Sequence, residues 1–296
     1  MFVSIHTIDA GTGAVAERES LRQYTQALEG VRDFPYQWRL LGIYLVYAGE
    51  RVTGLPPHAI DVVVKGVLLF AASMLIFAFS RFYLTESGSL AVVALYLIST
   101  IAGFTDQYTI YFTNDFAMIA CWFGAVYLVK VEQFAAAAAL AFVGAWAKET
   151  LLLVPVLIGL RFRRGRAPMW AVLLAAAAFV VPTAALREIY RAPLAKWAWW
   201  DMVFANVPFL QRSLYELSLT LKNNVKVLLL YNALWVVGLR SVLRTPDTFL
   251  KDLGITAVAY LALAYPVIYI RELRHFLPLA IVVLPPAIAA IERRAR

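Results

Sequence analysis

The sequence has little charge and almost no cysteine. Charged residues make up 16% of the 296 residues, against about 25% in an ordinary soluble domain. Cys121 is the single cysteine, which excludes an intrachain disulfide and a cysteine-based metal site. The chain opens without the apolar core of a secretory signal. It also has no P-loop, no Rossmann glycine pattern and no His-Glu-x-x-His motif, which argues against an ATP-driven pump or a soluble nucleotide-sugar enzyme.

Apolar side chains are abundant instead. They form 62% of the sequence, and the mean hydropathy is +0.71. A soluble core cannot use so many of them, because surface grows too fast relative to volume. The net charge of +8 comes from basic residues in short segments between apolar runs, which is typical of membrane topology rather than of nucleic-acid binding. We therefore predict an all-α, polytopic transmembrane helical bundle with no nucleic-acid partner.

Apolar runs of membrane length begin after residue 59. We expect spans at residues 60–80, 89–104, 114–129, 134–147, 151–160, 168–186, 225–239, 253–270 and 276–291. The fourth and fifth runs are short, so the expected count is eight to nine. Residues 1–59 are expected to form an outer-face segment with juxtamembrane helices. Residues 60–296 are expected to form the transmembrane domain, with an outer loop at 187–224.

Basic residues beside the span ends predict which side of the membrane each loop occupies. The positive-inside rule places Arg81, Lys130, the run 161–166 and the C-terminal arginines in the cytoplasm. A hairpin of two short helices that turns at Lys148 keeps both Lys130 and the 161–166 run inside, whereas a single helix would place that run outside. The hairpin also places the N-terminus outside. We expect that a helix preceding this sequence is missing from the chain; the alternative is unaided translocation of the N-terminal segment.

Polar and ionisable residues gather at the predicted outer ends of the spans. Charges at membrane depth usually face a polar cavity or a partner, although helix ends are also where charges ordinarily lie. We favour the interpretation that Asp106 is simply a charge at a helix end. For Asp115 both interpretations stay open, because it could be an ordinary carboxylate at a helix N-terminus or could face a polar cavity. The whole set is Asp106, Asn114, Asp115, Lys148, Glu149, Arg271, Glu272, Arg274 and His275.

Two basic residues near this outer side are candidate phosphate contacts. Lys148 and Glu149 occupy a hairpin turn with apolar flanks, so each needs a partner, either the other residue or a ligand phosphate. Arg39 follows Tyr36 and Trp38 in a segment that leads into a short amphipathic helix ending near Glu50. That pattern predicts an interfacial segment, in which Arg39 either binds lipid phosphate or only anchors the helix.

Three stretches together resemble the GT-C-fold integral membrane glycosyltransferases, which include protein O-mannosyltransferases and aminoarabinose transferases. Residues 145–155 (AWAKETLLLVP) are similar to the family's small-residue, Lys-Glu-Thr, leucine-rich hairpin. Residues 272–279 (ELRHFLPL) are similar to its Arg-aromatic-Leu-x-Pro-Leu segment before a late helix. Residues 19–24 (ESLRQY), followed by 36–39 (YQWR), are similar to its first outer loop.

The resemblance implies an enzyme that uses a polyprenyl-phosphate-linked sugar and a glycan, lipid or protein acceptor. It implies an acidic general base, for which Glu19 is the first choice and Glu17 the second, with Asp115 as a further carboxylate in the same cavity. The substrate-binding residues would be Arg39, Lys148, Glu149, Arg274 and His275.

The resemblance also implies a cellular location for the protein. The protein would lie in the bacterial inner membrane, in contact with membrane lipid, and its active site would face the periplasm or exterior. The family resemblance leaves open whether a divalent cation is required. Two other classes are also compatible with the residues: a transporter or lipid-handling protein, and a non-catalytic subunit of a cell-envelope assembly complex.

Overall fold

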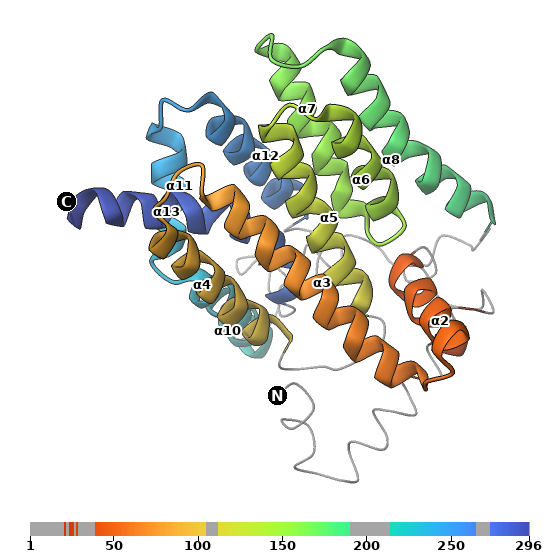
Figure 1. The fold of residues 1–296 in the computed structure, drawn as a ribbon. Coiled ribbons are helices and arrows are strands. Elements are labelled where there is room, and N and C mark those ends of the chain that lie inside the picture. Colours follow the sequence, from red (N-terminus) through yellow and green to blue (C-terminus); the bar gives the residue numbers. More distant parts are fainter. Residues whose placement is uncertain are drawn as a thin grey trace.

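The computed structural model describes residues 21, 24–26, 28, 39–104, 112–189, 214–264 and 273–295, and every regular element in these ranges is a helix. The elements are α2 (Leu41–Thr53), α3 (Pro57–Ser80), α4 (Glu86–Phe104), α5 (Thr113–Lys130), α6 (Phe134–Ala145), η3 (Glu149–Leu152), α7 (Leu153–Arg163), α8 (Met169–Ile189), α10 (Leu214–Tyr231), α11 (Leu234–Arg244), α12 (Thr248–Ala264), η5 (Leu273–Leu279) and α13 (Ala280–Ala295). Figure 1 shows their arrangement. The predicted all-α class is confirmed for this part of the chain.

Four helical segments are long and apolar enough to cross a membrane: Pro57–Ser80, Glu86–Gly103, Met169–Leu186 and Leu273–Arg294. A fifth is added if the bent pair α10 and α11 counts as one span. The length and composition of these helices identify the chain as an integral membrane protein. The helices at the other predicted spans are not both long and apolar enough to meet this test, so the count of eight to nine crossings stays a prediction.

The lipid-facing and protein-facing helices differ in how they expose apolar side chains. On α3 and α8, Phe70 is 68% exposed and Leu173 is 63% exposed, an arrangement that suits hydrocarbon rather than water. In contrast, α5 is buried along almost its whole length. Its Trp122 donates a hydrogen bond to the Pro278 carbonyl at 3.0 Å, which ties α5 to η5. Helices α5 and η5 therefore form the centre of the described bundle.

The predicted hairpin at Lys148 is present. Helix α6 ends at Ala145, Lys148 lies in the following turn, and η3 and α7 after it pack against α6. That both arms of the hairpin cross the membrane stays a prediction. The Trp146 carbonyl in this turn accepts hydrogen bonds from the backbone N–H groups of Leu40 and Leu41, at 2.8 and 3.0 Å. The turn is thereby fixed to the start of α2, which begins close to where the sequence predicts an interfacial helix.

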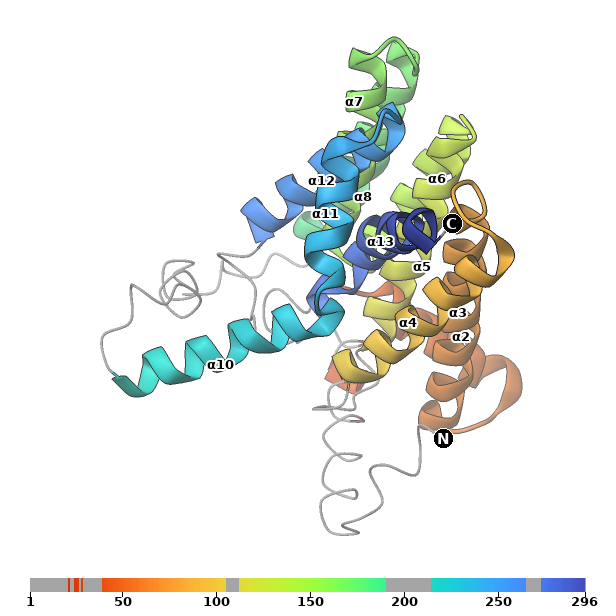
Figure 2. The same ribbon diagram turned by 90° about the vertical axis from the view of Figure 1, so that its left-hand side faces the viewer.

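The predicted span at residues 225–239 falls on the bent pair α10 and α11, so no single straight helix forms there, and a crossing by this pair stays a prediction. The chain turns between α10 and α11 by 68°, a bend that is plain in Figure 2. Asn232 lies in the break with φ of 52°. Asparagine is among the few residues that adopt this left-handed conformation readily, and it ends a helix there. The hydropathy of the segment carries no sign of such a break.

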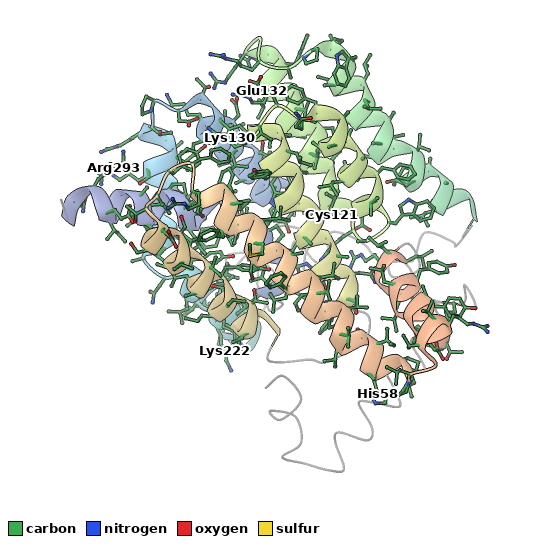
Figure 3. The ribbon with its side chains drawn as sticks, in the orientation of Figure 1. His58, Cys121, Lys130, Glu132, Lys222 and Arg293 are labelled. Atoms are coloured by element: carbon green, nitrogen blue, oxygen red, sulfur yellow. The ribbon has the colours of Figure 1, made fainter. Side chains whose placement is uncertain are left out.

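Ion pairs join several helices at the end of the molecule where α5 ends. Asp252 of α12 accepts from Arg164 at 2.6 Å and from Arg161 at 3.4 Å, and its side chain is fully buried. Lys130 contacts Asp247 at 3.2 Å, just before α12. In Figure 3, Lys130 lies far from His58 at the beginning of α3. Lys130, Arg161 and Arg164, which the sequence predicts to be cytoplasmic, therefore lie at one end of the bundle.

Candidate functional site

The candidate site begins at the first turn of α5, where three consecutive polar residues are buried. The Thr113 hydroxyl donates to the Asp61 carboxylate of α3. The Asn114 side chain accepts from the Gly42 N–H at 2.7 Å and donates to the Arg39 carbonyl at 2.9 Å. Asp115 contacts a different set of side chains. This short polar run thus joins α5 to α2, to α3 and to the site.

Helix α2 lies so close to α5 that only glycine fits at the contact. A Cβ at Gly42 would lie 2.5 Å from the Asn114 backbone nitrogen and 2.7 Å from the Thr113 carbonyl carbon. Backbone atoms cannot move aside as a flexible side chain would, so any larger residue would push the two helices apart. The short distance places Arg39, just before α2, beside the start of α5.

Asp115 lies at the centre of a buried group of basic residues. Its Oδ1 accepts from Lys148 Nζ at 2.6 Å, and its Oδ2 lies 3.4 Å from Arg274 Nε. The three side chains are only 5–7% exposed. Lys148 Nζ also lies 2.9 Å from His275 Nδ1. If Lys148 is charged, it has only donors, in which case Nδ1 accepts and the ring proton lies on Nε2.

The segment that carries Arg274 and His275 is held from several sides. The Arg274 guanidinium carbon lies 3.8 Å from the centre of the Phe112 ring, which is a cation–π contact. The Tyr260 hydroxyl of α12 donates to the His275 carbonyl at 2.6 Å, and the Tyr231 hydroxyl of α10 donates to the Phe276 carbonyl at 3.1 Å. These contacts fix η5, and with it the two basic side chains, against α10, α12 and the residue that precedes α5.

Arg39 and Glu149 form a second ion pair beside the first. Arg39 Nη2 lies 3.2 Å from Glu149 Oε2, and the Glu149 side chain is 44% exposed. Burial opposes ionisation of this carboxyl, but Arg39, a backbone N–H and Lys148 outweigh it and hold the pKa of Glu149 below its usual value. Lys148 and Glu149 therefore pair with other residues and not with each other.

An additional buried pair was missed by the sequence interpretation. Asp61 and Lys65 on α3 contact each other at 2.6 Å, with side-chain exposures of 0% and 11%. The signal was present, because an acid and a base four residues apart on a helix face each other, and charges within a span are rare. Through Thr113, Asp61 connects this pair to the first turn of α5.

The structure brings together Asp115, Lys148, Arg274 and His275, with Arg39 and Glu149 adjacent. Glu17 and Glu19 lie outside the described residues, as do Asp106, Arg271 and Glu272. Their place in the site stays a prediction. Within the described ranges, no group of three or more His, Cys, Asp or Glu side chains is arranged to hold a metal ion.

Comparisons with known protein families, with curated proteins and with solved structures found no match to this chain.

Proposed function

We propose that this protein is a GT-C-like membrane glycosyltransferase that transfers a sugar from a polyprenyl-phosphate donor to an acceptor on the non-cytoplasmic face. The observation that carries the proposal is the convergence of Lys148 and Arg274 on the buried Asp115. These residues come from stretches that are far apart in the sequence, and two of those stretches carry the family resemblance. The substrate-binding role of the group is inferred from its chemistry.

The charges of the group favour an anionic ligand. Among the described residues, Arg39, Lys148 and Arg274 bring three positive charges close to the carboxylates Asp115 and Glu149. Arginine can meet a phosphate with two parallel hydrogen bonds, and lysine supplies a compact charge. Basic residues at this place would also stabilise the charge that develops on the phosphate as it leaves the sugar.

The proposed reaction needs a base as well as a phosphate site. A carboxylate would take the proton of the acceptor hydroxyl as its oxygen attacks the anomeric carbon, and the bond from that carbon to the phosphate oxygen would break. Such proton transfer typically contributes about 10²–10⁴ in rate. Glu19, or failing that Glu17, is proposed for this role. Asp115 is proposed as a second carboxylate that orients Lys148 and Arg274.

A donor-binding measurement separates this proposal from a purely structural role. Arg274→Lys keeps the charge but loses the planar guanidinium, so we expect about tenfold weaker binding of a polyprenyl-phosphate sugar. The protein should remain folded in detergent. Arg51→Lys is the matched control, because Arg51 lies on the exposed part of α2 and contacts Tyr47. Unchanged donor affinity for Arg274→Lys, or a loss that only follows the loss of folded protein, would reject the phosphate site.

The proposal requires the site to face the exterior, in a bundle of eight to nine crossings. A cysteine at Gln211, in the proposed outer loop, should react with an impermeant thiol reagent in intact cells. A cysteine at Arg166, in the proposed cytoplasmic turn, should react only after the cells are opened. Both are introduced into Cys121→Ser. Arg166 is preferred to Arg164, because Arg164 pairs with Asp252. The reverse labelling pattern would contradict the topology.

A transporter or lipid-handling protein is the second candidate. The 68° break between α10 and α11 and the buried Asp61–Lys65 pair favour it, since transporters often combine broken helices with buried charges. Uptake of a polyprenyl-phosphate sugar into sealed vesicles, with the sugar still attached to its lipid, would support this class. Release of the sugar from the lipid would support the enzyme. A non-catalytic assembly subunit would do neither.

A further inference from the structure

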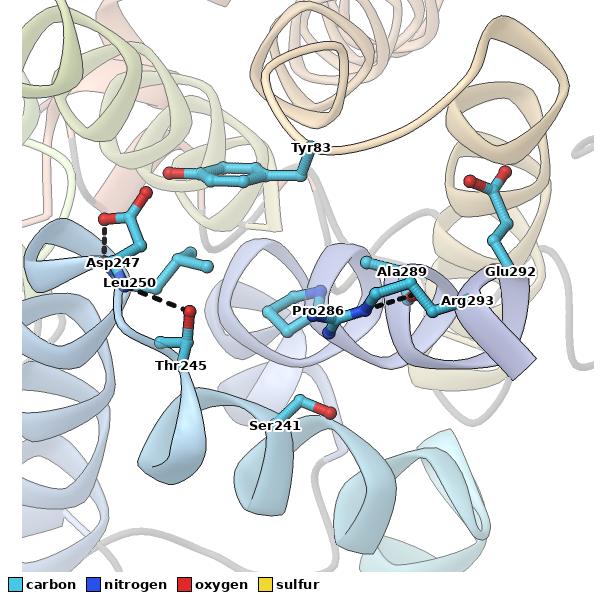
Figure 4. A pocket seen from close by; sticks show the side chains of 9 residues that line it. All are labelled: Tyr83, Ser241, Thr245, Asp247, Leu250, Pro286, Ala289, Glu292 and Arg293. Atoms are coloured by element: carbon cyan, nitrogen blue, oxygen red, sulfur yellow. Dashed lines mark hydrogen bonds between the residues drawn. The ribbon is translucent and has the colours of Figure 1, made fainter. Parts of the chain in front are cut away.

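A second polar site lies at the end of the bundle away from Asp115. It is a cavity of about 190 Å³ between α11, α12, α13 and the turn after α3. At about 30 Å³ for each water molecule, this space is large enough for a small polar group. Its polar lining, shown in Figure 4, consists of Tyr83, Ser241, Thr245, Asp247, Glu292 and Arg293.

Arg293 and Thr245 supply donors to the cavity, beside the Tyr83 hydroxyl. Arg293 Nε donates to the Ala289 carbonyl at 3.1 Å, which bends the side chain back along α13. That bond uses one of the five guanidinium N–H groups. The Thr245 hydroxyl oxygen accepts from the Asp247 N–H at 3.2 Å, so its own proton is directed elsewhere. An arginine with a neighbouring hydroxyl is suited to the oxygens of a phosphate.

The acceptors come from two carboxylates. Glu292 Oε1 accepts from the Thr85 hydroxyl at 2.6 Å, which fixes this side chain near the start of α4. Burial opposes ionisation of Asp247, but the N–H groups of Leu250 and Phe249 together with Lys130 hold its pKa below the usual value. The carboxylates balance Arg293 and Lys130 in charge. A ligand that carries both signs therefore suits the cavity better than a simple anion or cation.

The surroundings of the cavity place it near the membrane surface. Leu243 of α11 is 73% exposed and Ile291 of α13 is 47% exposed, which is expected for side chains in contact with lipid. Arg244 directly follows Leu243 on α11, and Arg294 lies shortly after Ile291 on α13. Basic residues beside exposed apolar ones mark the depth of the lipid headgroups. A membrane lipid could thus place its headgroup in the cavity and its acyl chains along α11 and α13.

We propose that this cavity binds the headgroup of a phosphoethanolamine lipid. Arg293 and Thr245 hold the phosphate, and the carboxylates of Glu292 and Asp247 face the ammonium. The N–H groups of a primary ammonium allow hydrogen bonds that a trimethylated headgroup cannot form. The site is separate from the Asp115 group, and the proposal does not depend on the glycosyltransferase function.

The test measures the thermal midpoint of the purified, delipidated full chain in detergent with added lipids of one acyl composition. Phosphatidylethanolamine should raise the midpoint more than phosphatidylcholine or phosphatidylglycerol, because a ligand that binds only the folded state stabilises it. Arg293→Gln should weaken the apparent affinity about tenfold. Ala289→Leu should also reduce binding, since it fills the cavity and leaves every polar lining group in place. Arg294→Gln, next in sequence, equally exposed and outside the cavity lining, should behave like the parent.

Three results would overturn the proposal. An equal rise with phosphatidylglycerol would indicate a general response to negative charge. An equal loss in Arg294→Gln would assign the effect to surface charge and not to the cavity. A rise with soluble phosphoethanolamine at the same concentration as the lipid would assign the site to a free metabolite. If Arg293→Gln lowers the midpoint even without lipid, the test rests on Ala289→Leu. Unchanged lipid binding in Ala289→Leu would show that the lipid does not bind in the cavity.

Discussion

Replacing Lys148 by methionine is expected to destabilise the folded protein by about 3–5 kcal/mol, because it removes a partner from a buried charge. Asp115 is 7% exposed and accepts from Lys148 at 2.6 Å. Its remaining basic neighbour, Arg274, lies farther away at 3.4 Å. The free energy of unfolding in detergent, measured by denaturant titration, gives the loss directly.

A double-mutant cycle shows whether the pair itself is responsible. Lys148→Met combined with Asp115→Asn removes both charges, so the double variant should lose clearly less stability than the sum of the two single variants. Simple additivity would mean that Asp115 and Lys148 do not stabilise each other. The cycle uses folding as its readout, and its outcome does not depend on the proposed substrate.

Replacing Asp252 by asparagine is the second change with a large expected effect. Its fully buried carboxylate accepts from Arg161, which is 8% exposed, and from Arg164, which is 36% exposed. The variant leaves Arg161 buried without this carboxylate, and we expect a loss of about 3 kcal/mol, the lower part of the range for broken buried pairs. The measured quantity is again the free energy of unfolding in detergent.

The control for Asp252 is Glu132→Gln, an equally small change at an exposed carboxylate near the end of α5. Surface substitutions usually change stability by less than about 0.5 kcal/mol. If Asp252→Asn lost no more stability than Glu132→Gln, the contacts between α7 and α12 would not depend on this carboxylate. A large loss in both variants would point to a general effect of removing negative charge.

The elements that sequence analysis placed best are those decided by local composition. The runs of apolar residues in α3, α4 and α8 are long, and membrane thickness alone requires helices of that length. The turn at Lys148 followed from counting the basic residues on either side of it. The gathering of Lys148, Arg274 and His275 followed from placing their span ends at one membrane face.

Features that depend on contacts between distant residues could not be predicted in this way. The sequence offered Lys148 and Glu149 either each other or a ligand phosphate as partners, whereas the fold supplies each with a partner from another segment. The break at Asn232 depends on a single backbone conformation, which hydropathy averages away. Asp61 contacts Lys65 within α3, at a spacing that the sequence does show, whereas its bond from Thr113 forms only when α3 packs against α5.

Loss of label from a radiolabelled polyprenyl-phosphate sugar, incubated with membranes that contain the protein, tests the proposed transfer most directly. We predict that label leaves the lipid for an acceptor in membranes with the parent chain. Much less should leave in membranes with an equal amount of folded Arg274→Lys, while Arg51→Lys retains the parent rate. Equal loss of label in membranes with and without the protein, across donors with different sugars, would contradict the proposed function.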